Sequence, residues 1–458
     1  MSHDVLVIGA GPAGSVVAAR LAAAGARVAL VGAAARAGWE GLSSRSVALL
    51  AEEGLELKSG IIDGPFPRSG QWGGGRPIEG TEWLVERRAL AAALRARARA
   101  AGVDDRWDTV TSLEWEGGQW CGVLRAGSAL AAAQVVDARG RRGPERHGPL
   151  LLAVGRQFRR RSGIACSAPA AHGTRIHPIE HGWCWWAVRR DALWVQVVGE
   201  PRGGPPAIGR AALGGPAMGP PAAWIASAAA QIPALAQTLD AGEPDGDLVA
   251  RPAHARLGIR ARLELVAGDA MRWRVGDAAH ALDPLSGQGV YEALRGARLV
   301  ATAVQSVMRG GDAPAAQRFV AERQEESWTS GVRTAGGFYG ENAARGAFWS
   351  QTAAGYQRLL PCAAPVAPHV ERRPVLCGGR ILEQDVIVTP QHPRGVWHLA
   401  DVPLVSLKEY LESAECATVG GAAAAVDRPA AAVASAIHWL QQTGVLARQL
   451  PPGVPLGG

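Results

Sequence analysis

Short apolar runs and a helical stretch alternate at the start of the chain. Val5–Ile8 and Arg27–Val31 are short runs of mostly branched apolar residues, and Ser15–Ala24 between them is rich in alanine. Strands that are covered on both faces show such continuous apolar runs, whereas a helix needs the longer stretch. The order strand, helix, strand therefore predicts a βαβ unit, the building block of a parallel sheet.

A second group of strands is expected in the middle of the chain. Gly182–Val188 lies in an alternating, strand-like region, and Trp194–Val198 lies opposite to it. A long helix is expected over Val290–Val304, after an apolar-leaning strand that ends near Val275. The pattern therefore predicts an α/β protein in which a parallel sheet is combined with a second sheet.

The composition shifts toward proline and valine beyond about residue 360. Two strands and two helices are expected there, over Arg380–Thr389, Gly395–Leu399, Leu404–Ala414 and Ala422–Gly444. The last helix is interrupted where Asp427 can cap a helix and Pro429 occupies its first turn. Val426–Leu446 has the pattern of a helix-turn-helix that ends in a short wing. This pattern predicts a small winged-helix-like domain that docks a protein or peptide.

The composition limits the possible functions. Of the 458 residues, 48% are hydrophobic and 19% are charged, so the chain can bury a large core and is not disordered. The net charge is +7, but the basic residues are spread along the chain, and Arg159–Arg161 is their compact run. A nucleic-acid partner is therefore not expected.

The six cysteines contain no Cys-x-x-Cys pair and no metal-ligand spacing. Neither a disulfide framework nor a metal site is expected from them. No uncharged apolar stretch reaches the roughly eighteen residues of a membrane span. The apolar run near the N-terminus is too short for a signal-peptide core. We expect a soluble, cytoplasmic protein with no membrane partner.

A glycine-rich turn, GAGPAG at residues 9–14, follows the first predicted strand directly and opens the first helix. Gly9 permits the tight turn, Gly11 lets backbone N–H groups approach a pyrophosphate, and Gly14 lets the helix pack against the strand. The helix dipole favours the phosphate charge. This context predicts a dinucleotide site. The acidic residue that usually holds the ribose is missing, because Gly32 follows the second strand.

A second glycine motif, GDAAHALDPLSGQG at residues 276–289, precedes the long predicted helix. Asp277 can bind a sugar-chain hydroxyl of FAD. The proline turn that begins at Pro284 leads into Gly287–Gly289, with Gln288 at its centre, where backbone N–H groups and the helix dipole face a reduced isoalloxazine. The two motifs together predict an extended FAD molecule bound non-covalently between them.

The two motifs resemble those of the FAD-dependent monooxygenases of the aromatic-hydroxylase class. WLVERRAL at residues 83–90 resembles the R-x-x-L segment of that family, with Arg87 in the arginine position, and QVVDARG at 134–140 resembles its returning strand. Arg45 lies where the family carries a flavin-contacting arginine. The resemblance covers roughly residues 4–350. It implies an FAD-binding Rossmann-like domain interleaved with a substrate-side β-sheet domain.

The tryptophan-rich strand points to one branch of this family. GWCWWAV at residues 182–188 resembles the G-W-x-W-x-I-P motif of the tryptophan-halogenase-related branch, and departs from it in the last two residues. Trp183, Trp185 and Tyr339 offer flat aromatic walls that suit an indole ring. The alternative is that these side chains are ordinary core of the second sheet.

Halogenation is disfavoured by the lysines of the chain. The resemblance implies that halogenases relay hypohalous acid through a lysine some residues before a Trp-Gly pair. Here the corresponding segment, residues 66–73, carries Arg68, and Lys58 lies further upstream. A guanidinium stays protonated and is weakly nucleophilic, so it is a poor substitute for an amine.

A halogenase-related flavoprotein that lacks this lysine and carries a small C-terminal domain resembles the maturation monooxygenases of tryptophylquinone biogenesis, above all those serving quinohemoprotein amine dehydrogenase. The resemblance implies hydroxylation of the indole ring of a tryptophan residue in a partner polypeptide, through a C4a-hydroperoxyflavin. NAD(P)H is the expected electron source. Because no second dinucleotide fingerprint appears, it would bind transiently or act through a flavin reductase.

Several alternatives remain open from the sequence. They are a flavin-dependent halogenase, a small-aromatic hydroxylase, a prenyl-chain reductase and a non-enzymatic, redox-sensing flavin-binding protein. The sequence identifies no catalytic residue. His280 and Asp283 lie close to the second glycine motif, and we expect structural roles for both.

The expected domain organisation places one FAD monooxygenase unit at residues 1–360 and a small C-terminal interaction domain at 361–458. Within the first unit, the FAD-binding parts are expected over about 1–60, 84–155 and 265–310. The substrate-side sheet is expected over about 61–83 and 156–264. The helical part is expected over 311–360.

Overall fold

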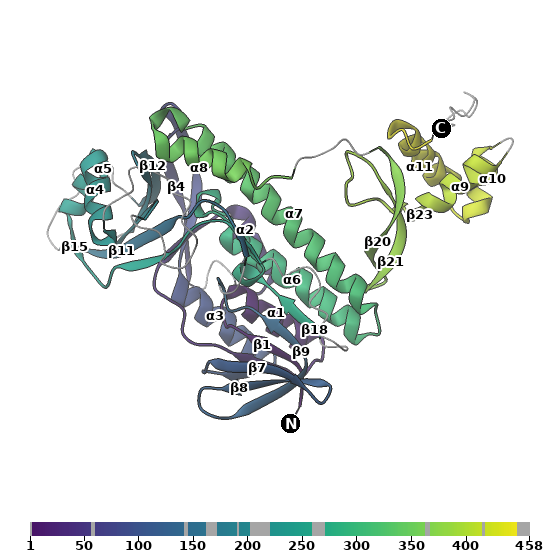
Figure 1. Cartoon of the computed structure of the whole chain (residues 1–458), viewed down its shortest axis with the longest axis horizontal. Helices are drawn as coiled ribbons and strands as arrows, with labels where there is room; N and C mark the ends of the chain where they lie inside the picture. Colours follow the sequence, from purple (N-terminus) through teal and green to yellow (C-terminus); the bar gives the residue numbers. More distant parts are fainter. Residues whose placement is uncertain are drawn as a thin grey trace. The chain divides into compact units, whose positions relative to one another are not determined.

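The structure is a computed structural model. It describes residues 2–55, 60–141, 145–161, 172–189, 192–201, 220–258, 271–361, 367–414 and 417–446. The chain divides into two compact units, of which the first comprises Met1–Thr302 and Val320–Pro361 and the second Ala303–Phe319 and Cys362–Gly458. Figure 1 shows the elements of both units. Within the described part of the chain, no helix is both long and apolar enough to cross a membrane.

The predicted βαβ unit forms the centre of the first sheet. The described strands of this sheet run in the order β6-β2-β1-β9-β8-β7, with β18 beside β9. β1 is parallel to β2 on one side and to β9 on the other. The strands are β1 (His3–Ile8), β2 (Val28–Val31), β6 (Asp104–Arg106), β7 (Val110–Glu116), β8 (Gln119–Leu124), β9 (Ala129–Asp137) and β18 (Met271–Arg274). β1 and β2 are almost entirely buried, as their continuous apolar runs require.

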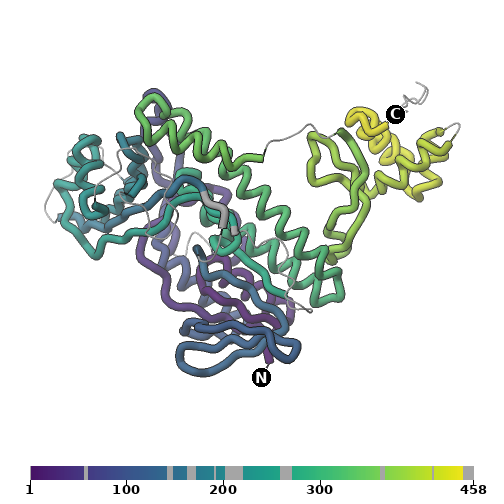
Figure 2. The backbone as a smooth tube through the Cα atoms, viewed as in Figure 1, coloured from purple at the N-terminus to yellow at the C-terminus, as the bar shows by residue number. Residues whose placement is uncertain are grey.

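The second sheet has the order β15-β11-β14-β13-β12-β4-β5-β3, with β16 beside β11. Its strands are β3 (Trp39–Leu42), β4 (Ile62–Trp72), β5 (Arg76–Glu86), β11 (Leu152–Arg160), β12 (Gly173–Ile179), β13 (Gly182–Val188), β14 (Ala192–Gly199), β15 (Gly242–Pro244) and β16 (Val249–Pro252). The predicted pairing of the two middle strands is present, because β13 and β14 are antiparallel with Trp183 opposite Val198. In Figure 2 the teal backbone of β11 to β16 lies apart from the purple and blue strands of the first sheet.

Both faces of β13 are buried, and the pleat assigns alternate residues to different cores. Trp183 and Trp185 belong to a cluster that also contains Leu285, Trp328 and Tyr339. The neighbouring Cys184 and Trp186 belong to a second cluster, formed with residues of α4 (Trp224–Gln231) and α5 (Pro233–Asp240). The tryptophan strand is therefore a central layer of the first unit.

Helices cover the first sheet and link it to the second. The remaining helices of this part of the chain are α1 (Pro12–Ala23), α2 (Ser44–Glu52), α3 (Arg87–Ala100), α6 (Gly289–Met308), α7 (Ala313–Gly340) and α8 (Ala347–Gln357). The predicted helix after the second glycine motif is thus present as α6, four residues longer than expected at its C-terminal end. A small third sheet joins β10 (Glu145–His147), β17 (Arg256–Gly258) and β19 (His280–Ala281).

Beyond Pro361, the described residues of the second unit form a hairpin, a pair of short strands and three helices. These elements are β20 (His369–Cys377), β21 (Arg380–Val388), β22 (His398–Leu399), β23 (Val402–Pro403), α9 (Leu404–Ser413), α10 (Val419–Val426) and α11 (Ala430–Gln442). The helices share one apolar core, which includes Leu407, Leu411, Val433 and Leu440.

Two predictions for this unit differ from the structure. The strand expected over Gly395–Leu399 is reduced to β22 and one isolated bridge between Ile387 and Val396. Asp427 does not cap the following helix: it ends α10 in the left-handed conformation, with φ 50°. Pro429 is instead the N-cap of α11. The short wing expected at the end of Val426–Leu446 is not formed there, because the described residues that follow α11 contain no strand.

Candidate active site

The turn between β1 and α1 has the geometry of a phosphate cradle. Gly9 has φ +114°, and a Cβ there would lie 2.3 Å from the carbonyl oxygen of Ala138. A Cβ on Gly14 would lie 1.9 Å from the Gly9 oxygen, so neither glycine can be replaced without moving backbone. At Gly11, by contrast, a Cβ would meet no atom within 4 Å. The space above Gly11 is therefore open, as a ligand requires.

The N-terminus of α1 keeps its backbone donors available to a ligand. Its N-cap, Gly11, has no side chain to accept from them, and the first turn contains no acidic residue. Unpaired N–H groups and the positive end of the helix dipole together favour an anion. This helix end fits a pyrophosphate.

The second glycine motif meets the first at the same place. Gly276 has φ +58°, and a Cβ there would lie 2.9 Å from the Cβ of Ala13 at the start of α1. Asp277 follows directly, is 43% exposed and forms a 3.2 Å ion pair with Arg141. The structure therefore brings Asp277 to the cradle, where its carboxylate is accessible to a sugar hydroxyl.

The turn that precedes α6 is built around Asp283. Pro284 opens a single 3-10 turn, and the Asp283 carboxylate caps it by accepting from the N–H of Leu285 at 2.8 Å. Gly287 ends the turn in the left-handed conformation, with φ +62°. Gln288 follows it, and α6 begins at the next residue, Gly289.

The glycines of this turn are exposed. Gly287 and Gly289 are both open to solvent, and a Cβ on either would meet nothing within 4 Å. Backbone N–H groups at this end of α6 are thus accessible from solvent, and their contact with a flavin ring stays a prediction.

Two arginines were predicted from the resemblance to contact the flavin region. Arg45, on α2, lies over the ring of Tyr291 in the first turn of α6, with 5.4 Å between its guanidinium carbon and the ring centroid. Arg87, at the start of α3, forms a 2.6 Å ion pair with Glu40 of β3. The structure therefore brings Arg45 beside the second glycine motif, whereas Arg87 is tied to β3.

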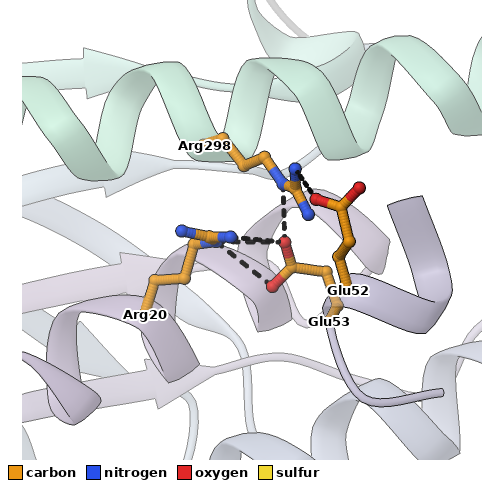
Figure 3. A network of polar contacts seen from close by, with 4 residues as sticks. All are labelled: Arg20, Glu52, Glu53 and Arg298. Atoms are coloured by element: carbon orange, nitrogen blue, oxygen red, sulfur yellow. Dashed lines mark hydrogen bonds and ion pairs between the residues drawn. The ribbon is translucent and has the colours of Figure 1, made fainter. Parts of the chain in front are cut away.

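An ion-pair network fixes the two glycine helices relative to each other (Figure 3). Arg20 of α1 donates to the Glu53 carboxylate at 2.9–3.1 Å, and Arg298 of α6 donates to the same carboxylate at 2.7 Å. Arg298 also bonds the more exposed Glu52. Because the Glu53 side chain is only 8% exposed, its charge depends on both arginines. The network holds α1 and α6 in register at the end of α2.

A buried polar chain connects the tryptophan strand with the turn before α6. The Nε1–H of Trp183 donates to the Tyr339 hydroxyl at 3.1 Å, and that hydroxyl donates to Asp283 Oδ2 at 3.2 Å. Tyr356 donates to the same oxygen at 2.6 Å and accepts from the N–H of Ala255. Asp283, Tyr339 and Tyr356 are at most 1% exposed.

This environment shifts the acidity of all three groups. Burial raises the pKa of Asp283 to about 6, although hydrogen bonds from Tyr356, Leu285 and Tyr339 oppose the shift. Burial and the nearby carboxylate raise the pKa values of Tyr339 and Tyr356 well above their usual range. The tyrosines therefore remain neutral donors, and the carboxylate titrates near neutral pH.

The other predicted pocket residue, Trp185, faces a different acid. Its Nε1–H donates to Glu82 at 3.3 Å, and Arg68 lies 3.9 Å from the same carboxylate. Trp185 is 9% exposed and Glu82 is 7% exposed. Arg68, the residue nearest to the halogenase lysine position, is therefore paired with an acid behind the aromatic wall. Lys58 lies outside the described residues.

The predicted pocket residues are more deeply buried than an open pocket wall would be. Trp183 is 2% exposed and Tyr339 is fully buried. The structure thus brings Trp183, Trp185 and Tyr339 into one cluster with Leu282 and Leu285 of the second glycine motif. Their indole-binding role stays a prediction.

A further acid lies in the first turn of α6. The Glu292 carboxylate lies 3.6 Å from His280 and accepts from the Ser327 hydroxyl at 2.6 Å. Burial opposes its ionisation, but these contacts and Arg295 lower the pKa of Glu292 to about 2. His280 and Asp283 thus both support the turn, in line with the structural roles expected for them.

Sequence reasoning missed Tyr356 and Glu82, which complete the two polar chains. The spacing of seven residues between Trp349 and Tyr356 places both on one face of a helix, and this was an available signal. Glu82 gave no signal, because an acid in an exposed-looking strand is unremarkable until the Trp185 strand packs on it.

No family model matches the chain, and no curated protein matches it significantly. Among solved structures, the chain is similar to QhpG, the peptidyl tryptophan dihydroxylase essential for tryptophylquinone cofactor biogenesis. The identity is 27% and the TM-score 0.77, over 97% of this chain and 100% of that one.

Two more distant structures share the fold. The flavin-dependent halogenase CmlS is 16% identical, with a TM-score of 0.66 over 97% of this chain and 95% of that one. Aklavinone-11 hydroxylase, solved with FAD and aklavinone, is 20% identical, with a TM-score of 0.56 over 74% and 69% of the two chains. The resemblance that the motifs indicated is confirmed: the chain is similar over nearly its whole length to a peptidyl tryptophan dihydroxylase, shares the fold of flavin-dependent halogenases and hydroxylases, and is a flavin-dependent monooxygenase.

Proposed function

We propose that this protein hydroxylates the indole ring of a tryptophan residue within a partner polypeptide, as a step of tryptophylquinone cofactor biogenesis. The observation that carries the proposal is the similarity to QhpG, which extends over 97% of this chain and the whole of that one. The halogenase CmlS also covers 97% of the chain, but at 16% identity and a TM-score of 0.66, and the aklavinone hydroxylase covers 74% of it.

The residues of the site fit FAD as the cofactor. The uncapped N-terminus of α1 would hold the pyrophosphate, Asp277 a sugar-chain hydroxyl, and the exposed turn Gly287–Gly289 the isoalloxazine. Bound FAD, reduced by electrons from NAD(P)H directly or through a flavin reductase, would supply the activation of O₂. The chain supplies position, donors and a dry surrounding.

The substrate side is formed by the tryptophan strand. An indole offers a flat apolar ring and one N–H donor, so it suits a wall of aromatic rings with buried acids behind them. Trp185, backed by Glu82, and Trp183, backed by Tyr339, would provide such a wall once the indole reaches them, since they are 9% and 2% exposed in this structure. We place the target indole on this side of the flavin turn.

The second unit would dock the partner polypeptide. Val370 and Leu376, on the first strand of the β20–β21 hairpin, are 41% and 45% exposed. These two side chains are the apolar contacts that the hairpin would offer to a partner. A separate docking unit would favour a polypeptide over a small phenol as the substrate.

The decisive experiment supplies the purified flavoprotein with its tryptophan-bearing partner, captured from the native host, under ¹⁸O₂ and with NAD(P)H and a flavin reductase. We expect the partner tryptophan to gain ¹⁸O, as measured by peptide mass spectrometry. A Gly14→Val variant, which cannot form the cradle, is the inactive control.

Three results would overturn the proposal. The first is turnover of free tryptophan or a phenol without any polypeptide product. The second is halogen instead of oxygen in the product when bromide is present. The third is saturation of an isoprenoid substrate without oxygen incorporation, which would indicate a prenyl-chain reductase.

A further inference from the structure

The adenosine end of the dinucleotide site departs from the usual arrangement. An acidic residue after the second strand ordinarily holds the ribose. Here Gly32 occupies that position, and a Cβ there would lie 2.5 Å from the Ala10 backbone nitrogen and 2.7 Å from the Ala10 Cβ. The first glycine turn thus fills the space of the missing side chain, and another element must hold this end of the ligand.

Helix α3 presents a rigid arginine at this position. Arg95 of α3 is 2% exposed and donates from Nη1 to the Gly32 carbonyl at 2.8 Å. It also donates to Asp105 at 2.7 Å and to the Arg106 carbonyl at 2.9 Å. These three bonds fix the guanidinium plane at the carboxyl ends of β2 and β6.

An exposed tryptophan lies on this guanidinium. Trp107 follows β6 directly, and its ring centroid lies 3.7 Å from the Arg95 guanidinium carbon. At 62% exposure, it is the most exposed large hydrophobic side chain among the described residues. The next residue, Asp108, accepts from the N–H groups of Thr109 and Ala126, so the backbone here is held in place. The indole is fixed on a cation, and its other face exposes apolar surface to water. A ligand that stacks on this face would bury that surface, which is favourable.

The position of Trp107 matches the expected path of the adenosine. β6, β2 and β1 are consecutive parallel strands, with Arg106 opposite Val31. Ligands of such sheets bind outside the carboxyl ends of the strands. The pyrophosphate site at α1 and Trp107 therefore lie along the same edge of the sheet, separated by Gly32.

We propose that Trp107, held flat by Arg95, is the stacking platform for the adenine ring of FAD and compensates for the missing ribose-binding acid. This inference rests on the proposed FAD cofactor. Stacking of a base on an aromatic side chain contributes about 1–3 kcal/mol, which is enough to replace one hydrogen-bonded carboxylate.

The test measures flavin affinity in the flavin-free full-length protein, by fluorescence titration with FAD, FMN and ADP. Trp107→Ala should raise the Kd for FAD roughly ten- to a hundredfold. Trp107→Phe, which keeps an aromatic plate, should stay within about threefold of the wild type. FMN, which has no adenine, should bind the wild type and Trp107→Ala equally. ADP should compete with FAD in the wild type and lose this ability in Trp107→Ala.

Met308→Ala, which removes another exposed large apolar side chain at the far end of α6, is the matched control, and its FAD affinity should be unchanged. The thermal midpoints of all flavin-free variants establish that they fold. An unchanged Kd for FAD in Trp107→Ala would overturn the proposal that Trp107 is the stacking platform. A loss of FMN binding as large as the loss of FAD binding would overturn it too. Binding of ADP through Trp107 in a protein that takes up no flavin would support the platform and overturn the FAD assignment.

Discussion

Asp283 accepts three buried hydrogen bonds, more than Asp277, the other acid of the second glycine motif. Its two oxygens accept from Leu285, Tyr339 and Tyr356, which come from its own turn, α7 and α8. One carboxylate therefore shapes the turn before α6 and anchors it to the aromatic cluster. The sequence placed Asp283 beside the flavin motif, but its two tyrosine partners lie 56 and 73 residues away, and only the packed helices reveal them.

The raised pKa of Asp283 makes protein stability fall as the pH rises. The folded carboxyl holds its proton up to about pH 6, whereas the unfolded one loses it near 3.8. The folded state thus binds more protons than the unfolded state between these two pH values. The free energy of unfolding therefore falls as the pH rises through this window, by about 3 kcal/mol in total. We expect Asp283→Asn to abolish this component, which urea denaturation from pH 4 to 7 can measure.

Asp137 provides an opposite reference in the same experiment. Burial opposes its ionisation, but Arg139 and Arg272 lower its pKa to about 2. Its contribution to stability is present above about pH 4 and is lost as the pH falls toward 2. Asp137→Asn should therefore leave the slope between pH 5 and 7 unchanged. Parallel wild-type and Asp283→Asn curves in that range would contradict the assignment.

At the level of elements, we expect two glycines of the first turn to have different roles, Gly14 in stability and Gly11 in cofactor binding. A Cβ at Gly14 would collide with backbone at 1.9 Å, whereas one at Gly11, with φ −77°, meets nothing. We expect Gly14→Ala to lower the free energy of unfolding by roughly 2 kcal/mol or more. Gly11→Ala should leave stability within about 0.5 kcal/mol but weaken FAD binding, because its methyl group enters the phosphate space.

Urea denaturation of the flavin-free variants and FAD titration measure these two effects separately. Equal loss of stability in both variants would mean that Gly11 is also structural. Unchanged FAD binding in Gly11→Ala would place the pyrophosphate elsewhere.

The network of Figure 3 makes a second prediction for elements. Glu53→Gln leaves Arg20 and Arg298 without their shared charge and should cost about 2 kcal/mol of stability, since the arginines are partly solvated. Glu52→Gln, at a carboxylate that is 60% exposed, should cost less than about 0.5 kcal/mol. Denaturation compares the two variants directly. Equal effects would show that the network does not hold α1 against α6.

Local patterns predicted most elements but not the pairing between distant ones. The runs at Val5–Ile8 and Arg27–Val31 correspond to β1 and β2 within two residues at each end. The hairpin partner β20 went unpredicted, because a strand with arginines and a proline carries little apolar signal. Asp427 was misassigned, because an aspartate suits an N-cap and the left-handed end of a helix equally well.

At the scale of the whole molecule, we expected from the sequence a boundary at residue 360. In the structure, the second compact unit also includes Ala303–Phe319, which precedes that boundary. The Ser306 hydroxyl accepts from the N–H of Ile381, and Arg318 pairs with Glu383 at 2.9 Å. These contacts span 75 and 65 residues, so no local pattern could reveal them. A chain that ends at residue 361 would remove these two contacts from α6 and α7.

We therefore expect deletion of residues 362–458 to lower the thermal midpoint while leaving FAD affinity within about threefold, because the flavin motifs lie in the first unit. Capture of the partner polypeptide should be strongly weakened. Flavin titration, thermal unfolding and co-purification measure the three properties. Undiminished capture by the shortened chain would place the docking surface on the first unit instead.

The close approach of Gly32 to Ala10 also limits how the cofactor site can be redesigned. A substitution that introduced an acid at position 32 would first push a side chain into the backbone of the first glycine turn. Restoring the usual ribose contact would therefore cost stability before it could add a hydrogen bond to the cofactor. Under the proposed arrangement, a redesign for tighter FAD binding should start from the residues around Trp107, whose exposed ring leaves room for added contacts.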